Sequence, residues 1–263
     1  MSLFPRVFAI ANQKGGVGKT TTTVNLSTAI AALRKKVLLI DLDAQGNATV
    51  SLGISRQNAP HNAYTMLTGQ DTLDSAIVPT QIPCLSVLPS AKELLGLDIE
   101  LAQVEKPQFY LKQALQNTQL DFDYIFIDCP PAVGMLTINA LTAADAVIVP
   151  IQCEYLALEG VADLIKTIER VQKNFNPRLA LHGVLLTMFD KRSRLSSSVC
   201  QDVRDFFKQQ VYETVIPRNV RIPEAPSHGK PVLLYDFKCV GAQAYLQLAK
   251  EFLKREKEFV SHG

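Results

Sequence analysis

Short apolar runs rich in β-branched residues alternate along the chain with longer segments in which apolar residues recur every three or four positions. Near-continuous apolar runs are typical of parallel strands that are covered by helices on both faces. The segments predicted as strands are 7–11, 37–40, 85–88, 124–127, 146–151, 184–188 and 214–216.

Helical periodicity fills most of the chain between these runs. The segments predicted as helices are 20–33, 109–120, 158–174, 196–210 and 241–259. Alternation of strands and helices predicts an α/β fold, a doubly wound and mostly parallel sheet flanked by helices. Residues 55–82 are punctuated by Pro60, Gly69 and Pro79, which favours a turn-rich excursion with one or two short helices. We expect a single P-loop ATPase domain over residues 1–263.

A glycine-rich loop joins the first predicted strand to the first predicted helix. Glycines let backbone N–H groups converge on a phosphate, and the positive end of the helix adds to the attraction. Lys19 is expected to bridge the β- and γ-phosphates, and the Thr20 hydroxyl to ligate Mg²⁺. The predicted nucleotide-binding residues of the loop are Gln13, Lys14, Gly15, Gly16, Val17, Gly18, Lys19, Thr20 and Thr21.

This loop departs from the usual phosphate-binding pattern GxxxxGK[ST] at its first position. Gln13 stands where that pattern has glycine, and a second lysine, Lys14, follows it. A lysine at this point is a mobile charge that can reach a phosphate other than the one that its own loop cradles. The alternative is an ordinary solvated lysine.

Carboxylates follow two further predicted strands. Asp41 and Asp43 come directly after residues 37–40, and Asp128 directly after 124–127. Ligands of parallel sheets bind at the carboxyl ends of the strands, so we expect Asp41 and Asp128 to hold Mg²⁺ together with Thr20. Asp43 lies two positions after Asp41 and therefore on the same face of an extended strand, where it can orient the attacking water. Helix capping is the alternative role for such aspartates.

Composition and charge argue against several classes of protein. Apolar residues make up 47% of the chain, and the net charge is only +2, which argues against a surface coated with nucleic acid. The five cysteines form no CxxC pair, so zinc and redox motifs have no support. The apolar runs are far shorter than a membrane span, which predicts a cytoplasmic protein. Residues 191–230 nevertheless hold eight basic and four acidic residues, a local surplus that suits contact with a phosphate backbone.

Four segments together resemble one family. They are 14–22, 41–49, 128–131 and 216–226, and the similarity extends from Val7 to the last predicted helix. The chain is similar to the ParA/Soj family of chromosome- and plasmid-partitioning ATPases, which carry a deviant form of the phosphate-binding loop. Two departures from that family are Ala44, where many members have proline, and Ile222-Pro223.

The resemblance implies a mechanism in which ATP drives the formation of a sandwich dimer. Lys14 would contact the nucleotide of the partner, and Asp43 would be the catalytic aspartate, acting with Lys14 and Lys19. Pro217 and Asn219 would lie beside the adenine.

The resemblance also implies partners. The ATP-bound dimer would bind double-stranded DNA without sequence specificity through Arg192 and Arg221. A centromere-binding protein of the ParB/Spo0J type would accelerate a slow hydrolysis, and the protein would be associated with the nucleoid. Whether the cargo is a chromosome or a plasmid stays open.

Three alternatives use a similar loop. A MinD-like positioning ATPase needs a membrane anchor, and segment 245–259 is amphipathic; however, apolar residues 245, 248, 249, 252 and 259 fit a helix that packs on its own sheet. A reductase resembling the nitrogenase iron protein needs cluster-binding cysteines, and neither Cys129 nor Cys153 lies in a glycine-rich context. A kinase or synthetase would need a second substrate site, for which the sequence gives no signature.

Overall fold

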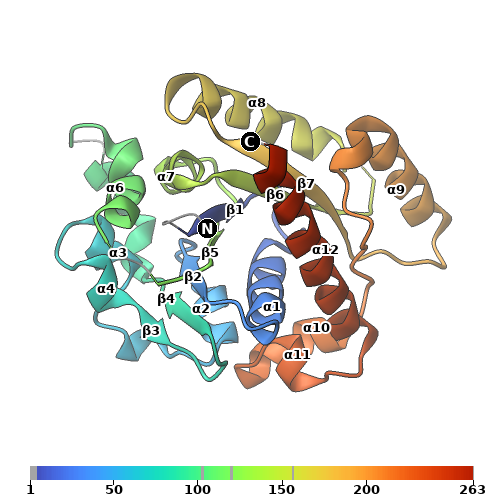
Figure 1. Ribbon diagram of the computed structural model, residues 1–263, viewed down its shortest axis with the longest axis horizontal. Coiled ribbons are helices and arrows are strands. Elements are labelled where there is room, and N and C mark those ends of the chain that lie inside the picture. Colours follow the sequence, from blue (N-terminus) through green and yellow to red (C-terminus); the bar gives the residue numbers. More distant parts are fainter. Residues whose placement is uncertain (1–4, 102–103, 119–120, 156, 263) are drawn as a thin grey trace.

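The computed structural model describes residues 5–101, 104–118, 121–155 and 157–262, without the side chains of residues 58, 98, 159 and 259–262. Within these ranges the chain forms a seven-stranded sheet in the order β3-β4-β2-β5-β1-β6-β7 (Figure 1). The strands are β1 Arg6–Ile10, β2 Val37–Asp41, β3 Val78–Pro79, β4 Leu85–Leu88, β5 Tyr124–Asp128, β6 Ala146–Gln152 and β7 Ala180–Thr187.

All pairings in this sheet are parallel except that of the short edge strand β3 with β4. Parallel pairing brings the carboxyl ends of the central strands to one edge. The register places Ile10 beside Asp128 and Asp128 beside Asp41, so β1, β5 and β2 end at the same level. The predicted fold class is confirmed, and this shared edge positions the site.

Helices cover both faces of the sheet, as the alternation along β1 requires. Phe8 and Ile10 pack in one apolar cluster with α1 and α12, whereas Val7 and Ala9 pack in a second cluster with α6, α7 and α8 (Figure 1). The α-helices are α1 Lys19–Ala32, α2 Asn47–Ser51, α3 Ala63–Leu67, α4 Leu73–Ala76, α5 Leu97–Leu101, α6 Tyr110–Gln116, α7 Met135–Ala143, α8 Glu159–Asn174, α9 Arg194–Phe207, α10 Arg221–Glu224, α11 Val232–Tyr235 and α12 Val240–His262. The 3₁₀ turns are η1 Arg56–Asn58, η2 Lys92–Leu95, η3 Pro107–Phe109, η4 Lys208–Gln210 and η5 Ala225–His228.

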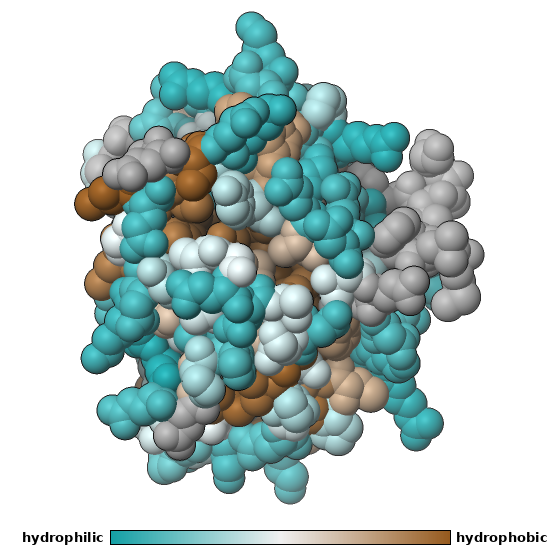
Figure 2. Space-filling view, turned by 90° about the vertical axis from the view of Figure 1, so that its left-hand side faces the viewer, coloured by the Kyte–Doolittle hydropathy of each residue, from teal (hydrophilic) through white to brown (hydrophobic). Residues whose placement is uncertain are grey.

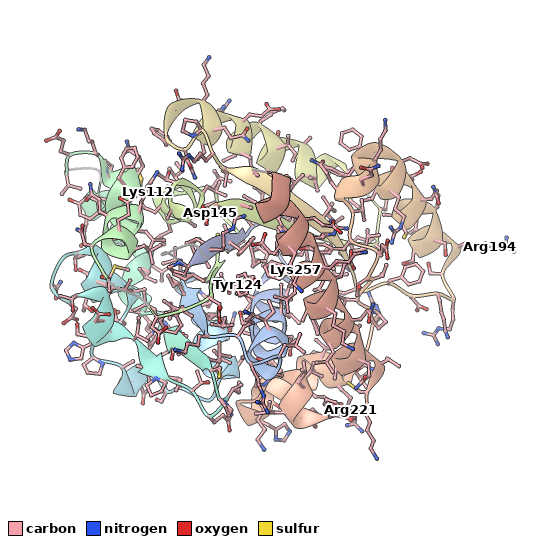
Figure 3. The ribbon with its side chains drawn as sticks, in the orientation of Figure 1. Lys112, Tyr124, Asp145, Arg194, Arg221 and Lys257 are labelled. Atoms are coloured by element: carbon pink, nitrogen blue, oxygen red, sulfur yellow. The ribbon has the colours of Figure 1, made fainter. Side chains whose placement is uncertain are left out.

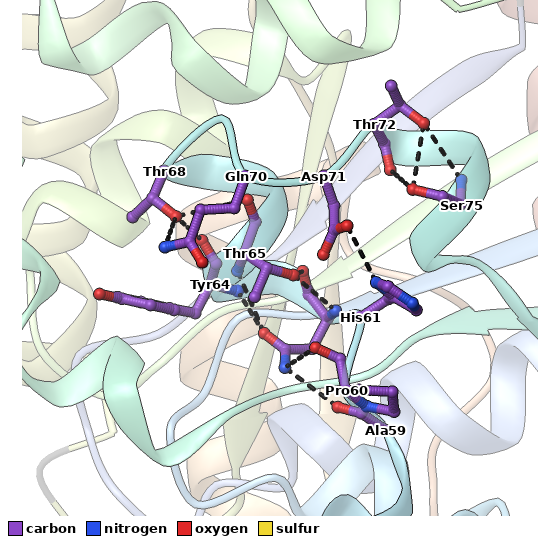
Figure 4. Close-up of polar contacts among 11 residues, drawn as sticks. Ala59, Pro60, His61, Tyr64, Thr65, Thr68, Gln70, Asp71, Thr72 and Ser75 are labelled. Atoms are coloured by element: carbon purple, nitrogen blue, oxygen red, sulfur yellow. Dashed lines mark hydrogen bonds and ion pairs between the residues drawn. The ribbon is translucent and has the colours of Figure 1, made fainter.

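The excursion at residues 55–82 contains α3, α4 and β3. Hydrogen bonds between residues close in sequence hold its short helices in place. Asn62 caps α3 by accepting from the backbone N–H groups of Tyr64 and Thr65, and Thr72 caps α4 (Figure 4). His61 Nδ1 lies 2.9 Å from Asp71 Oδ1. The side of the molecule that carries this excursion is largely hydrophilic, with apolar side chains visible between the polar ones (Figure 2).

Helix α12 packs its apolar stripe on the sheet, as its periodicity predicts. Tyr245, Leu248 and Phe252 are buried, and the ring of Phe252 lies 4.9 Å from that of Phe8. Residue 259 of the same stripe lies outside the described side chains. Glu256 also turns inward, where Arg6 Nε donates to its carboxylate at 3.2 Å. No helix in the described part of the chain is long and apolar enough to cross a membrane.

The strand predicted at 214–216 is wrong. The segment runs beside β7, and Tyr212 N and Ile216 N donate to carbonyls of β7, but the residues between them do not continue the ladder. Their amides are taken by a carboxylate instead: Glu213 N donates to Glu251 Oε1 at 2.8 Å, and Thr214 N donates to Glu251 Oε2 at 2.9 Å. The apolar residues of 214–216 pack against the protein, but the backbone N–H groups of Glu213 and Thr214 bind Glu251 of α12 instead of a neighbouring strand.

Two helix predictions also differ from the structure. The sequence gives no prediction of helix α7, because apolar residues and the buried polar residues Thr137, Asn139 and Thr142 are spread around the helix and leave no amphipathic period. Helix α6 ends at Gln116, before the expected end of the 109–120 segment, and residues 119–120 lie outside the described part of the chain.

Replacing Glu251 with alanine should lower the free energy of unfolding by about 1–3 kcal/mol, because two backbone amides lose a charged acceptor. Arg255, whose guanidinium lies 2.9 Å from Glu251, loses its acidic partner and keeps its hydrogen bonds to the Gln210 and Val211 carbonyls. Urea denaturation followed by circular dichroism measures the change. Lys250→Ala on the exposed face of α12 is the matched control, and equal midpoints for the two variants would contradict the assigned role of Glu251.

Candidate nucleotide-binding site

The glycine loop lies between β1 and α1 and opens outward. Gly16 and Gly18 have φ values of +76° and +91°, which non-glycine residues rarely adopt. A Cβ at Gly15 or Gly16 would meet nothing within 4 Å. The loop is anchored from below, since Thr187 Oγ1 of β7 donates to the Val17 carbonyl at 2.8 Å. The result is an open, backbone-lined cradle of the kind that phosphates fill.

Helix α1 begins at Lys19 directly after this cradle. No side chain caps its N-terminus, and its first turn carries no acid, so the first N–H groups remain available for an anion. Lys19 is buried, and its Nζ donates to the Lys14 carbonyl at 3.2 Å. Burial lowers the pKa of Lys19, while the charge of Asp128 acts in the opposite direction.

Two carboxylates lie side by side beneath the loop. Asp41 and Asp128 are paired in the register of β2 and β5 and are fully buried. Thr49 donates to Asp41 Oδ2 through its backbone N–H at 2.8 Å and its hydroxyl at 2.7 Å. Thr23 Oγ1 lies 3.0 Å from Asp128 Oδ1. Burial raises the pKa of both acids, and the neighbouring charge of Asp41 raises the pKa of Asp128 further.

This pair fits a divalent cation. Asp128 Oδ2 is buried without a hydrogen-bond partner among the described residues, and an orphaned carboxylate oxygen is costly unless a cation or its water satisfies it. Oxygen ligands are those that Mg²⁺ prefers. The Thr20 side chain lies beside Asp128 and acts against the rise in the pKa of that acid. The structure thus brings together Thr20, Asp41 and Asp128, the three residues predicted to hold the metal.

Asp43 lies on the turn that follows β2. Its backbone N–H donates to Asp41 Oδ1 at 3.2 Å, and its own Oδ1 accepts from Gln45 N at 3.0 Å. Its negative charge acts against the lowering of the Lys19 pKa. The side chain is half-buried and therefore retains access to solvent.

Lys14 does not point into its own cradle. Its Nζ lies 2.7 Å from Glu154 Oε1, and its stem packs near Gly160 at the start of α8. Gln13 also faces α8, with its Nε2 3.5 Å from Thr167 Oγ1. The two lysines of the loop are therefore separated, one buried beside the acids and the other held at the mouth by an acid of its own chain.

The two residues predicted to lie beside the adenine follow the segment along β7. Pro217 forms a bridge with Phe189, two residues after Thr187 at the base of the loop. The Asn219 side chain accepts from Arg221 N at 3.1 Å. Both lie on one connection near the cradle, but no described contact joins either of them to the glycine loop.

The two predicted DNA-binding arginines lie on different elements and are both paired. Arg192, in the loop before α9, binds Asp190 through two hydrogen bonds of 3.0 and 3.1 Å. Arg221 of α10 lies 2.9 Å from Glu224 and 3.4 Å from Asp236. Figure 3 shows Arg221 on α10 and, well separated from it, Arg194 at the start of α9. No described contact links Arg192 and Arg221.

Sequence reasoning missed the residues that support this site. Thr23 follows Lys19 by one helical turn, a spacing that does predict a shared face with the loop lysine. Thr49, Ser90 and Glu154 carried no comparable signal, because they reach the site only after the chain has folded. Ser90 donates its backbone N–H to Thr49 Oγ1 at 2.9 Å and its hydroxyl to the Asp43 carbonyl.

Known proteins place the chain in a family. A family model described as an AAA domain matches residues 5–181. The chromosome partitioning protein ParA of Caulobacter vibrioides is 53% identical over 255 residues, which cover 96% of each chain. The sporulation initiation inhibitor protein Soj of Bacillus subtilis is 50% identical over 246 residues, 94% of this chain and 97% of that protein. The chain belongs to the ParA/Soj family. It is an ATPase, and the resemblance seen in the sequence is confirmed.

Solved structures agree with this membership of the ParA/Soj family. Cobyrinic acid a,c-diamide synthase from Mycobacterium smegmatis with bound ATP analogue and magnesium has a TM-score of 0.85 at 39% identity, covering 96% of each chain. The septum site-determining protein MinD from Pyrococcus horikoshii, complexed with Mg-ADP, has a TM-score of 0.78 at 27% identity, covering 94% of this chain and 96% of that chain. ParA/Soj membership is favoured over the MinD alternative, because the partitioning relatives are about twice as similar in sequence.

Replacing Thr49 with valine should raise the Mg²⁺ concentration needed for half-maximal ATPase activity by about tenfold. The change keeps the shape of the side chain but removes the hydroxyl that stabilises the charged form of Asp41. Magnesium titrations of ATP hydrolysis measure the shift. Thr118→Val, two residues beyond the end of α6, is the matched control, and an unchanged magnesium requirement in Thr49→Val would show that Asp41 does not serve the metal.

Proposed function

We propose that this protein is a partitioning ATPase that closes as an ATP-bound sandwich dimer on DNA and reopens after hydrolysis. The observation that carries the proposal is the separation of the two loop lysines. Lys19 is buried above Asp41 and Asp128, whereas Lys14 is held at the mouth of the cradle by Glu154. A single nucleotide needs only the inner lysine of this loop. The outer one is therefore placed to serve a nucleotide in a second copy of the chain.

In the proposed site the loop from Gln13 to Thr21 binds the phosphates of ATP, and Thr20, Asp41 and Asp128 hold Mg²⁺. The metal would supply positive charge to the phosphate oxygens. Asp43 orients a water molecule for in-line attack on the γ-phosphorus, and Lys14 and Lys19 neutralise the negative charge that develops. Pro217 and Asn219 lie along the adenine. Few protein groups take part in bond making, which is consistent with slow turnover.

Arg192 and Arg221 provide the proposed contact with double-stranded DNA. Both are paired with acids, but the pairs are at the surface, where an ion pair contributes only about 0–1 kcal/mol, so a DNA phosphate can replace the acid at low cost. Lys191 and Arg194 flank Arg192 in the sequence, Arg218 precedes Arg221, and none of these three forms an ion pair among the described residues. Contact with phosphates alone explains binding that ignores sequence and weakens with salt.

The proposed setting is the bacterial cytoplasm, with the protein associated with the nucleoid and acting as one ATPase domain over residues 1–263. A centromere-binding protein of the ParB/Spo0J type would be the partner that accelerates hydrolysis. The alternative, a MinD-like ATPase on a membrane, requires an apolar face free to enter lipid. Tyr245, Leu248 and Phe252 of α12 are instead buried against the sheet. Flotation with anionic vesicles, with and without ATP, separates the two functions.

Replacing Lys14 with alanine should abolish ATP-dependent dimerisation while leaving ATP binding by the monomer within a few-fold of the unmodified protein. The outer lysine is lost, but the cradle and Lys19 remain. Light scattering with Mg-ATP measures the dimer, and binding of a fluorescent ATP analogue measures affinity. Lys166→Ala on the exposed face of α8 is the control. Normal dimerisation of Lys14→Ala would overturn the assignment of this lysine to a second copy.

The double variant Arg192→Glu, Arg221→Glu should lose DNA binding at least about tenfold in a gel shift at physiological salt, because two phosphate contacts become repulsive. ATP hydrolysis in the absence of DNA should be retained. The double variant Arg170→Glu, Lys166→Glu makes the same change in charge on α8. If both double variants lose DNA binding equally, binding follows net charge and these two arginines form no specific surface.

A further inference from the structure

An arginine that follows in the sequence, Arg56, hydrogen-bonds to the turn that carries Asp43. Arg56, the first residue of η1, reaches back to residues 44 and 45 with both ends of its guanidinium. Its Nη2 donates to the Ala44 carbonyl at 2.7 Å, and its Nη1 donates to the Gln45 carbonyl at 2.6 Å. These are short, charge-assisted hydrogen bonds to two successive peptide groups.

The same two peptide groups hold Asp43 on their other side. The N–H of the peptide between Ala44 and Gln45 donates to Asp43 Oδ1 at 3.0 Å. The N–H of the next peptide, between Gln45 and Gly46, donates to the Asp43 carbonyl at 2.8 Å. Each peptide is therefore bound by Arg56 at its oxygen and by Asp43 at its nitrogen.

The backbone of this turn is shaped to receive the arginine. Gly46 has a φ of +65°, and a Cβ at this position would lie 2.5 Å from Arg56 Cδ and 2.6 Å from Nε. The arginine stem thus occupies the space that any other residue at position 46 would need for its side chain. The fit of Gly46 to Arg56 marks the contact as a built feature of the turn rather than a chance approach of a surface side chain.

Other bonds fix the backbone of Asp43 but leave its carboxylate to the turn. The Asp43 N–H donates to Asp41 Oδ1, and the Asp43 carbonyl accepts from the Ser90 hydroxyl. Among the described residues, the Asp43 carboxylate accepts one hydrogen bond, from the N–H of Gln45. The orientation of that one peptide group therefore decides where the carboxylate points.

We propose that Arg56 is a positioning residue for ATP hydrolysis, which holds the 44–45 peptide so that its N–H aims the Asp43 carboxylate at the attacking water. This inference rests on the role of Asp43 in the proposed function. A cation on a carbonyl oxygen polarises the peptide and strengthens its N–H as a donor. Only the planar fork of arginine spans two successive carbonyls, so lysine cannot replace it fully. In this role Arg56 acts through Asp43 and needs no contact of its own with the nucleotide.

Arg56→Ala should lower the turnover number about 10- to 100-fold, the range expected when a reacting group is misplaced by about 1 Å. The dissociation constant for a non-hydrolysable ATP analogue should change less than about twofold, because the loop and Lys19 are untouched. Arg56→Lys should retain an intermediate rate and keeps the test valid if the alanine variant folds poorly. Arg170→Ala, an exposed arginine of α8, is the matched control. Equal losses of rate and affinity would reduce Arg56 to a structural role and overturn the proposal.

A double-mutant cycle separates this inference from the function on which it rests. Adding Arg56→Ala to Asp43→Ala should cause no further loss of rate beyond about twofold, because Arg56 acts through Asp43. Millimolar guanidinium should partly restore the turnover of Arg56→Ala, and should not restore that of Asp43→Ala. A full additional loss in the double variant, or normal turnover of Arg56→Ala beside an impaired Asp43→Ala, overturns the role of Arg56 alone. Normal turnover of Asp43→Ala overturns the role of Asp43 and the inference with it.

Discussion

Two buried carboxylates at the ends of adjacent parallel strands determine how the residues around the site are arranged. Asp41 and Asp128 end adjacent strands at the same level, so their carboxylates repel each other when both are charged. Water cannot screen them, because both are fully buried. The surrounding residues respond to that constraint: Lys19 lies above the pair, threonine hydroxyls from α1 and α2 donate to it, and one oxygen of Asp128 is left for a cation.

Because the strands are parallel, everything attached to their carboxyl ends meets over this pair. The loop after β1 supplies the phosphate cradle, the turn after β2 supplies Asp43, and β7 supports the cradle through Thr187. The arrangement explains how the fold brings together a lysine, three acids and a helix N-terminus. Lys19 and the helix N-terminus follow β1, Asp41 and Asp43 come from the end of β2, and Asp128 ends β5, so three adjacent strands hold these groups in register.

Much of this could be predicted from the sequence, and the limit has a physical cause. Apolar runs identified six of the strands, and the loop lysines and aspartates are separated by so few residues from those strands that their positions follow from strand geometry. Thr49, Ser90, Glu154 and Arg56 could not be found in this way. They reach the site from other elements, and their roles consist of bonds to backbone or carboxylate groups that have no counterpart in local sequence pattern. The strand wrongly expected at 214–216 has the same origin, since a glutamate nearly forty positions away takes the amides that a ladder would have used.

That glutamate has a consequence for assembly. Unpaired amides on the outermost strand of a sheet invite another chain to add a strand there, the route by which sheet proteins polymerise without control. Here the rim beyond β7 is closed twice, first by the connection that runs beside it and then by the carboxylate of Glu251. Closing this rim leaves copies of the chain no free backbone edge at β7 along which to pair, which suits the reversible, ATP-dependent dimer proposed above. Glu251 of α12 thus blocks the addition of a further strand at this edge of the sheet.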